Sequence, residues 1–298
     1  MISFPNAKIN IGLRITERRP DGYHNLETVF HPVGLYAGTP LNPVSFCDTL
    51  EVVPSANDEF RFKGRPIDCP LEKNLVYKAV MVYREELKKR NINPMPVSVT
   101  LEKNLPDGAG LGGGSADASF TLKLLDSLTF PGDSASSPFT ADDLERMALR
   151  LGADCPVFIR NQSCYAEGVG EKMSPVSLGL AGMWCVIVKP EIYVSTREAF
   201  AGVRPHKDND AFPLSRLGEL PKTEWKDVAD NDFETSLFPA YPRLGEIKQG
   251  LYDAGAFYAS MSGSGSSLFG LFESRETATR AASGLASDES LFVRLLML

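Results

Sequence analysis

The stretch from Leu105 to Ala118 constrains the fold of this chain more than any other, because five of its 25 glycines fall within residues 108–114. Glycine at this density lets the backbone adopt positive φ angles and turn several peptide N–H groups toward one point. Apolar residues then recur at helical spacing from Phe120 to Leu128, and the pattern stops at residues 131–132. A loop with free N–H groups that leads into a helix N-terminus attracts anions. The sequence therefore predicts a phosphate-binding loop, with a flexible surface loop as the alternative.

The loop does not match the two common nucleotide-binding fingerprints. Gly108, Gly110 and Gly113 satisfy G-x-G-x-x-G, and Asp126 stands near the position of a ribose-binding acid. Asp126 falls inside the helical pattern, however, and residues 104–107 separate the preceding strand from the first glycine. No Gly-Lys-Ser or Gly-Lys-Thr follows. We therefore expect a third kind of phosphate binder.

Two acids, Asp107 and Asp117, flank the predicted loop. Their charges would repel a bound phosphate unless the carboxylates point away from it or toward a bound cation. The sequence leaves these two possibilities open.

The composition limits the classes of partner. The 298 residues, 43% hydrophobic and 23% charged, are enough for two domains of average size. A net charge of −7 without a long basic cluster makes nucleic acid a poor partner. The five scattered cysteines indicate neither a disulfide framework nor a zinc site. A patterned strand near residue 1 and the lack of any apolar run of about 20 residues predict a cytoplasmic protein without a membrane segment.

The N-terminal segment alternates strictly between apolar and polar residues from Asn6 to Ile15. Lys8 and Asn10 must then share one face of a strand, whose polar side is by itself a solvated surface. A turn at residues 20–22 brings Tyr23 and His24 to the entry of the next apolar run. On its own, His24 is a turn histidine.

The remaining patterns predict an α+β chain with a boundary near residue 180, separating residues 1–180 from 181–298. Helices are expected at 74–90, after the glycine loop, from Thr140 with Asp143 as its capping partner to about 151, and at 196–200, 242–255 and 275–286. Strands are expected at 48–52, 97–101, 157–159, 183–189, 257–261, 268–272 and 291–298. The C-terminal order resembles a split βαβ sandwich. Loops are expected at 38–43, 61–71 and 204–221.

Two further loops carry small or acidic residues. Asp154 stands between Gly152 and Pro156, where an acid is usually a turn residue. Residues 262–267 are all Ser or Gly, more than a tight hairpin needs. Either this is a plain hairpin, or it presents a second surface of N–H and hydroxyl groups to the glycine loop.

Three stretches, 5–10, 106–118 and 261–267, together resemble the superfamily of small-molecule kinases named for galactose, homoserine, mevalonate and phosphomevalonate (GHMP kinases). Residues 21–24, 112–115, 152–156 and 231–234 look like the branch whose substrate carries a cytidine diphosphate. The resemblance implies ATP-dependent phosphorylation of the 2-hydroxyl of a cytidine-diphosphate-linked methylerythritol, in the non-mevalonate isoprenoid route. It also implies an N-terminal domain like the second domain of ribosomal protein S5, which binds ATP, and a ferredoxin-like C-terminal domain that contributes to the substrate site.

The resemblance also implies roles for particular residues. Lys8 and Asp154 match the catalytic pair, with Asp154 accepting the hydroxyl proton and Lys8 holding Asp154 and the developing charge. The positions that match the ATP site are Pro106, Asp107, Gly108, Ala109, Gly110, Leu111, Gly112, Gly113, Gly114, Ser115, Ala116, Lys103, Asn74 and Leu75. The positions that match the substrate site are Asn10, Tyr23, His24, Tyr193, Gly263, Ser264 and Gly265. Tyr23 and Tyr193 would stack on the cytosine, and Ser115 is the one candidate ligand for the Mg²⁺ that accompanies ATP.

Departures from the superfamily pattern are local. Asn6 replaces a more usual proline, residues 107–109 vary the loop entry, and the loop at 38–43 looks long. Two rival functions remain open at this stage. One is a kinase of mevalonate or homoserine, whose substrate offers no base to the Tyr23–His24 turn, and the other is a nucleotide-binding relative without catalysis.

Overall fold

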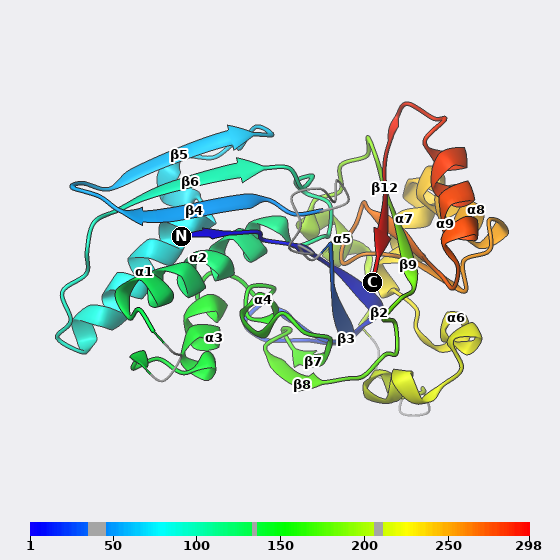
Figure 1. Ribbon diagram of the computed structural model, residues 1–298. Coiled ribbons are helices and arrows are strands. Elements are labelled where there is room, and N and C mark those ends of the chain that lie inside the picture. The colour runs from blue at the N-terminus through cyan, green and yellow to red at the C-terminus, as the bar shows by residue number, and fades with distance from the viewer. Residues whose placement is uncertain (35–45, 133–135, 206–210) are drawn as a thin grey trace.

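The computed structural model describes residues 1–34, 46–132, 136–205 and 211–298, arranged as three sheets with helices around them (Figure 1). The predicted loop at 38–43 and part of the one at 204–221 lie outside the described residues. Within the described part of the chain, no helix is both long and apolar enough to cross a membrane.

The first sheet has the order β1-β4-β6-β5. Its strands are β1 (Ile2–Ser3), β4 (Thr49–Pro54), β5 (Glu59–Gly64) and β6 (Val97–Lys103). Strand β5, parallel to β6 at the sheet edge, corrects the expectation of a polar loop beginning at residue 61. Its apolar residues, Phe60 and Phe62, pack on the core while charged residues alternate with them, as is normal for an edge strand with one face in water.

Helices cover one face of this sheet and build the larger N-terminal core. They are α1 (Leu75–Lys89), α2 (Gly113–Thr129), α3 (Ala141–Leu149) and α4 (Val157–Arg160). The predicted capping box of Thr140 and Asp143 is present. Helix α4 corrects a predicted strand at 157–159. Its three apolar residues are all buried beside α2, and a short run that is buried on every side does not distinguish helix from strand.

The second sheet has the order β2-β3-β7-β8 and carries the N-terminal alternating segment. It comprises β2 (Ala7–Arg18), β3 (His24–Val33), β7 (Cys164–Gly168) and β8 (Lys172–Pro175). The predicted strand of Lys8 is thus confirmed and is longer than expected. A register shift between Ile11 and Leu13, at Gly12 with φ +70°, bends it.

The third sheet has the order β10-β11-β9-β12, with every neighbouring pair antiparallel, and confirms the predicted split βαβ order. It comprises β9 (Trp184–Pro190), β10 (Tyr258–Met261), β11 (Leu268–Phe272) and β12 (Leu291–Met297). Helices α8 (Pro242–Asp253) and α9 (Arg275–Leu285) pack on one face. The other described helices of this half are α5 (Thr196–Gly202), α6 (Trp225–Val228) and α7 (Asp232–Ala240), with 3-10 turns at Leu214–Glu219 and Lys222–Glu224.

Strand β2 joins the two halves of the molecule (Figure 1). Ile9 and Ile11 share a core with Ile187 and Phe269 of the third sheet, on the face opposite α8 and α9. Beyond the bend, Leu13 and Ile15 enter the other C-terminal core. Burial on both sides therefore fixes the strand that carries Lys8.

Candidate active site

One cavity brings together six separate segments of the chain. It lies between strand β2, the start of α1, the glycine loop, the turn before α4, the segment that leads into α5 and the small-residue loop after β10. Its lining consists of Lys8, Leu75, residues 106–115, Asp154, Tyr193, Val194, Thr196 and residues 263–265. Most of the positions that the resemblance implied thus border a single space.

Lys8 and Asp154 meet in this cavity. The Lys8 Nζ lies 3.4 Å from Asp154 Oδ2, and the lysine side chain is 2% exposed whereas the aspartate is 42% exposed. A buried ammonium needs partners, because its desolvation is costly. It finds a second one in Asn10 Oδ1 at 2.6 Å, and the ring of Phe30 lies 5.2 Å away. From the sequence alone, the polar face of β2 could have been exposed to solvent. In the structure it is buried at both Lys8 and Asn10.

A chain of hydrogen bonds fixes the amide that holds Lys8. Asn10 Nδ2 donates to Thr28 Oγ1 at 3.0 Å, and that hydroxyl donates to the Gly12 carbonyl at 2.6 Å. Gly12 N in turn donates to the Tyr258 hydroxyl at 3.0 Å. These bonds hold the Asn10 amide where it accepts from Lys8, and Asn10 is buried and does not belong to the lining of the cavity.

The glycine loop uses its carbonyl groups for the fold and leaves its N–H groups for a ligand. Leu111 O accepts from Lys8 N at 2.9 Å, Ala109 O from Ser267 N at 3.2 Å, and Gly110 O from Ser262 Oγ at 2.9 Å. Among the described residues, no N–H of 107–115 donates a hydrogen bond to the protein. The loop runs into α2, so these donors and the positive end of the helix face the cavity together. Ala116 differs, because its N–H donates to Gly112 O inside the helix.

The small-residue loop at 262–267 lies directly against the glycine loop, through the Ser262 and Ser267 contacts above. A Cβ at Gly263 would lie 3.3 Å from Lys8 Nζ and 3.4 Å from Asn10 Oδ1. This geometry supports the second interpretation from sequence, in which the loop presents N–H and hydroxyl groups to the glycine loop, over a plain hairpin. Glycine at 263 lets the backbone approach the ammonium closely.

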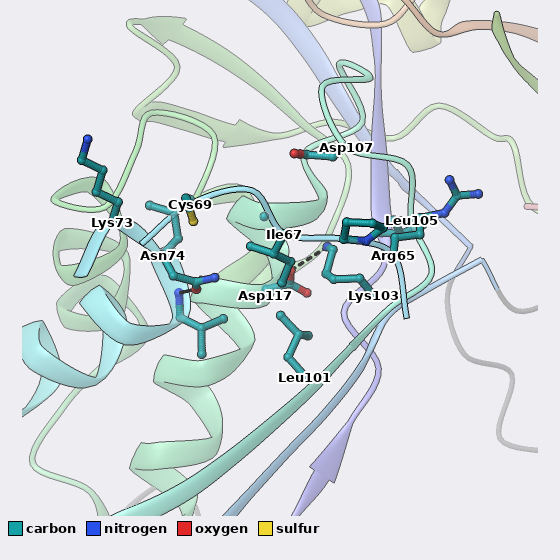
Figure 2. A pocket seen from close by; sticks show the side chains of 14 residues that line it. Arg65, Ile67, Cys69, Lys73, Asn74, Leu101, Lys103, Leu105, Asp107 and Asp117 are labelled. Carbon is teal, nitrogen blue, oxygen red and sulfur yellow. Dashed lines mark hydrogen bonds and ion pairs between the residues drawn. The ribbon is translucent and has the colours of Figure 1, made fainter. Parts of the chain in front are cut away.

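A second cavity adjoins the first and shares Leu75, Asp107 and Gly114 with it (Figure 2). Asn74, Leu101, Lys103, Leu105 and Asp117 also line it. Asn74 caps α1, because its Oδ1 accepts from Val76 N at 2.9 Å. Largely apolar walls beside the glycine loop suit a flat heterocycle.

Lys103 and Asp117 form a buried charge cluster with Asp48. Lys103 Nζ lies 2.7 Å from Asp117 Oδ2 and also contacts Asp48 Oδ2. Burial raises the pKa of Asp117, while the pKa of Lys103 is raised because the two carboxylates outweigh its own burial. Of the two acids that flank the loop, Asp117 thus turns away from the phosphate region and is paired.

Three aromatic residues lie near the predicted substrate positions. Tyr193 lines the first cavity at the glycine loop, where a Cβ on Gly108 would lie 3.1 Å from its ring. The ring of Phe200 in α5 stacks on His24, with centroids 4.7 Å apart and planes inclined by 20°. Tyr23 is 63% exposed. The sequence did not indicate Phe200, because an isolated phenylalanine in a short helical pattern carries no signal of its own.

Asn231 belongs to the motif at 231–234. It is buried, and it donates through Nδ2 to the carbonyls of Met261 and Gly263. Asn231 thus holds the start of the small-residue loop through these two hydrogen bonds.

Comparisons with known proteins identify the family to which this chain is similar. The family model of the GHMP kinases N terminal domain matches residues 74–162, and that of the GHMP kinases C terminal matches residues 216–289. The chain is similar to the 4-diphosphocytidyl-2-C-methyl-D-erythritol kinase of Bacteroides thetaiotaomicron, with 47% identity over 93% of this chain and 94% of the relative. It is 42% identical to the same kinase of Porphyromonas gingivalis, over 95% of this chain and 96% of the relative.

Solved structures match over the whole chain. A crystal structure of 4-(cytidine 5'-diphospho)-2C-methyl-D-erythritol kinase superposes with a TM-score of 0.75 and 32% identity, and covers 100% of both chains. A homoserine kinase from Cytophaga hutchinsonii superposes with a TM-score of 0.72 at 16% identity, covering 100% of this chain and 94% of the other. The second likeness concerns the fold alone.

Proposed function

The chain belongs to the GHMP kinase family, among its 4-diphosphocytidyl-2-C-methyl-D-erythritol kinases, and on this premise we propose that it transfers the γ-phosphoryl group of ATP to the 2-hydroxyl of 4-diphosphocytidyl-2-C-methyl-D-erythritol. The products are ADP and the 2-phosphate, within the methylerythritol phosphate route to isoprenoids. The observation that carries the proposal is the 3.4 Å pair of Lys8 and Asp154 beside the free N–H groups of the glycine loop.

Asp154 is the base in this proposal. Its carboxylate is half-exposed at the cavity wall, so an alcohol can reach it, and the Lys8 ammonium lies 3.4 Å away. A carboxylate is a weak base toward an alcohol, and the proton therefore moves late in the reaction. Most of the acceleration comes from aligning the hydroxyl with the γ-phosphate and from stabilising the transferring oxygens.

Lys8 supplies the cation that this stabilisation requires. Because Asn10, Phe30 and β2 hold the ammonium in place, it needs little reorganisation when negative charge develops on the phosphoryl oxygens. The N–H groups of Gly108 to Ser115 would hold the β- and γ-phosphates opposite it.

The nucleotide base belongs in the second cavity, next to the loop. Its walls at Leu75, Leu101 and Leu105 offer apolar surface, and the Lys103 side chain lies among them beside Asp117 (Figure 2). The buried cluster of Lys103 with its two carboxylates supports the cavity wall.

The cytidine end of the substrate belongs at Tyr23, His24 and Phe200. Stacking of a base on an aromatic ring contributes about 1–3 kcal/mol. Burial and the charge of Arg18 lower the pKa of His24, so its imidazole is neutral and can accept or donate a hydrogen bond at the base edge. Mevalonate and homoserine offer no such base, which argues against the rival kinases.

Mg²⁺ bound to the ATP phosphates fits the donor set of the first cavity. The Ser115 hydroxyl and the carboxylates of Asp107 and Asp154 are among the oxygen donors that line it, and Mg²⁺ prefers few protein oxygens plus phosphates and waters. Within the described ranges, no group of three His, Cys, Asp or Glu side chains could hold a metal without such help. Bound there, the ion would neutralise phosphate charge.

Domain roles and location complete the proposal. Residues 1–180 would bind ATP, and residues 181–298, which contain the whole third sheet, would contribute the small-residue loop and Phe200 to the substrate site. All five cysteines are free thiols, as in proteins of the reducing cytoplasm, where we place this activity.

The test is a coupled assay of ADP release with 4-diphosphocytidyl-2-C-methyl-D-erythritol, mevalonate and homoserine as separate acceptors. Turnover of the cytidine substrate alone supports the proposal. Turnover of mevalonate or homoserine alone would replace it with a rival kinase, and ATP binding without turnover of any acceptor would indicate a catalytically silent relative.

A further inference from the structure

The segment 230–234 contacts both sides of the active site without lining it. Asn231, which is 2% exposed, begins α7 and caps it, since its Oδ1 accepts from Phe233 N at 3.0 Å. Its Nδ2 donates to Met261 O at 2.7 Å and to Gly263 O at 2.9 Å. Every hydrogen-bonding atom of this amide group is thus used, and two of its bonds hold the loop that follows β10.

Glu234, in the first turn of α7, holds the end of β10 that leads into the same loop. Its Oε1 accepts from Met261 N at 2.7 Å and from Ser260 Oγ at 3.0 Å, while its Oε2 pairs with Lys248. Asn231 and Glu234 therefore fix Met261 through both its carbonyl and its N–H group.

The other contacts of the segment are with β2. Asp232 Oδ2 accepts from Ile15 N at 2.6 Å, and Asp230 O accepts from Leu13 N at 2.8 Å. Strand β2 carries Lys8, so one five-residue segment ties the strand of the catalytic lysine to the loop of Gly263.

The distance between strand β2 and the small-residue loop matters, because Gly263 leaves little free space around the Lys8 ammonium. A Cβ there would lie 3.3 Å from both Lys8 Nζ and Gly110 O. A displacement of Gly263 by a fraction of an ångström would alter the space left for Lys8 and for a phosphoryl group beside it.

We propose that Asn231 is a positioning residue for phosphoryl transfer, which holds Gly263 against the Lys8 ammonium and fixes the register of the small-residue loop on the glycine loop. The inference rests on the proposed function, and Glu234 assists by holding Met261. The first glycine loop holds ATP by its own N–H groups, so loss of the Asn231 contacts acts on the chemical step and not on ATP affinity.

The experiment compares Asn231→Ser with Ser274→Ala. Serine at 231 is still a good N-cap but lacks the two amide donors. Ser274 caps α9 through Thr277 N at 3.2 Å, so Ser274→Ala removes a cap in the same half of the molecule without touching the loop. We expect Asn231→Ser to lower kcat per folded molecule at least about tenfold, with the ATP dissociation constant within about threefold of wild type, and Ser274→Ala to leave both unchanged.

Hydrogen exchange gives a second readout that does not depend on turnover. Followed by mass spectrometry, the amides of 261–267 should exchange faster in Asn231→Ser and at the wild-type rate in Ser274→Ala. Unchanged exchange in that segment, or an activity loss fully explained by unfolded protein, would overturn the inference. Failure of the wild-type protein to phosphorylate the cytidine substrate would instead overturn the proposed function, and the exchange comparison would still show whether Asn231 holds the loop at 261–267.

Discussion

Gly110 lies so close to Ser262 that a Cβ atom at position 110 would fall 2.0 Å from the Ser262 carbonyl oxygen. The backbone at Gly110 also has φ +71°, a conformation that side chains other than glycine rarely adopt. The glycine loop and the small-residue loop thus contact each other through backbone atoms, so no rotation of a side chain could make room for a Cβ at position 110.

Gly110→Ala should therefore separate the two loops. We expect ATP affinity, measured by titration calorimetry, to fall more than about tenfold, and the free energy of unfolding to drop by about 1–3 kcal/mol. Gly250→Ala is the matched control, because no atom lies within 4 Å of its added methyl and its position in α8 favours alanine by about 0.5–1 kcal/mol. Wild-type ATP affinity in Gly110→Ala would contradict the role of this contact.

Asp154→Asn should abolish turnover while ATP binding stays within a few-fold of wild type, because the loop and not the acid holds the nucleotide. Loss of a general base costs about 10²–10⁴-fold in kcat. Steady-state kinetics and calorimetry on the same preparation provide the comparison. Equal losses of turnover and of ATP affinity would show that Asp154 acts in binding.

Lys8→Met should lower kcat at least about 100-fold, since it removes the buried cation and keeps most of the side-chain volume. If Lys8 and Asp154 act as one unit, the double variant with Asp154→Asn will be about as slow as the slower single variant. The measurement is a double-mutant cycle on kcat/KM. Multiplicative losses would mean that the two residues act independently, despite their 3.4 Å contact.

Phe200→Leu should raise KM for the cytidine substrate about tenfold and leave KM for ATP unchanged, because it removes the ring beside His24. Leucine keeps apolar packing against Phe233, whose ring lies 4.9 Å away. Phe60→Leu, the same change in an aromatic pair on β5, serves as control and should leave both constants at wild-type values. An equal rise in both KM values would place Phe200 outside the cytidine site.

His31 should make the protein lose stability on acidification. Its Nδ1 lies 2.7 Å from Ser163 Oγ, and burial lowers its pKa to about 4. Between about pH 4 and about pH 6.5 the unfolded chain holds a proton at this position that the folded chain does not. The contribution of His31 to the free energy of unfolding therefore falls as the pH falls through this window, by about 1.4 kcal/mol per pH unit.

The check is urea unfolding of wild type and His31→Gln at several pH values from 4 to 7. The variant should lack this share of the slope, whereas His24→Gln should change it much less, because His24 is only partly buried. A slope unaltered by His31→Gln would contradict the assignment.

Features that depend on neighbours in the chain were predictable. The cap at Thr140 is confirmed, as are α1 and the split order of the C-terminal strands, because each follows from turn chemistry or periodicity over a few residues. The glycine loop belongs to this group, since the conformational freedom of its residues is intrinsic to them.

Features that depend on tertiary packing were not predictable from the sequence. The run at 157–159 folds as α4, and β5 forms from a segment that looked like a loop, because the surfaces that cover them come from elsewhere in the chain. The position of Phe200 against His24 depends on how α5 packs on β3, which no local pattern records.

The sequence by itself determined that this chain has a glycine-rich loop that leads into a helix, an alternating N-terminal strand with Lys8 on its polar face, and the motifs of a kinase family. Only the tertiary structure decided that Lys8 is buried, that its ammonium meets a carboxylate 146 positions further along the chain, and that the glycine loop keeps its N–H groups free while its carbonyls are bound. The physical reason is the distance along the chain over which each effect acts. Backbone freedom and helix capping act over a few residues, whereas the burial of a charge depends on every segment that packs around it.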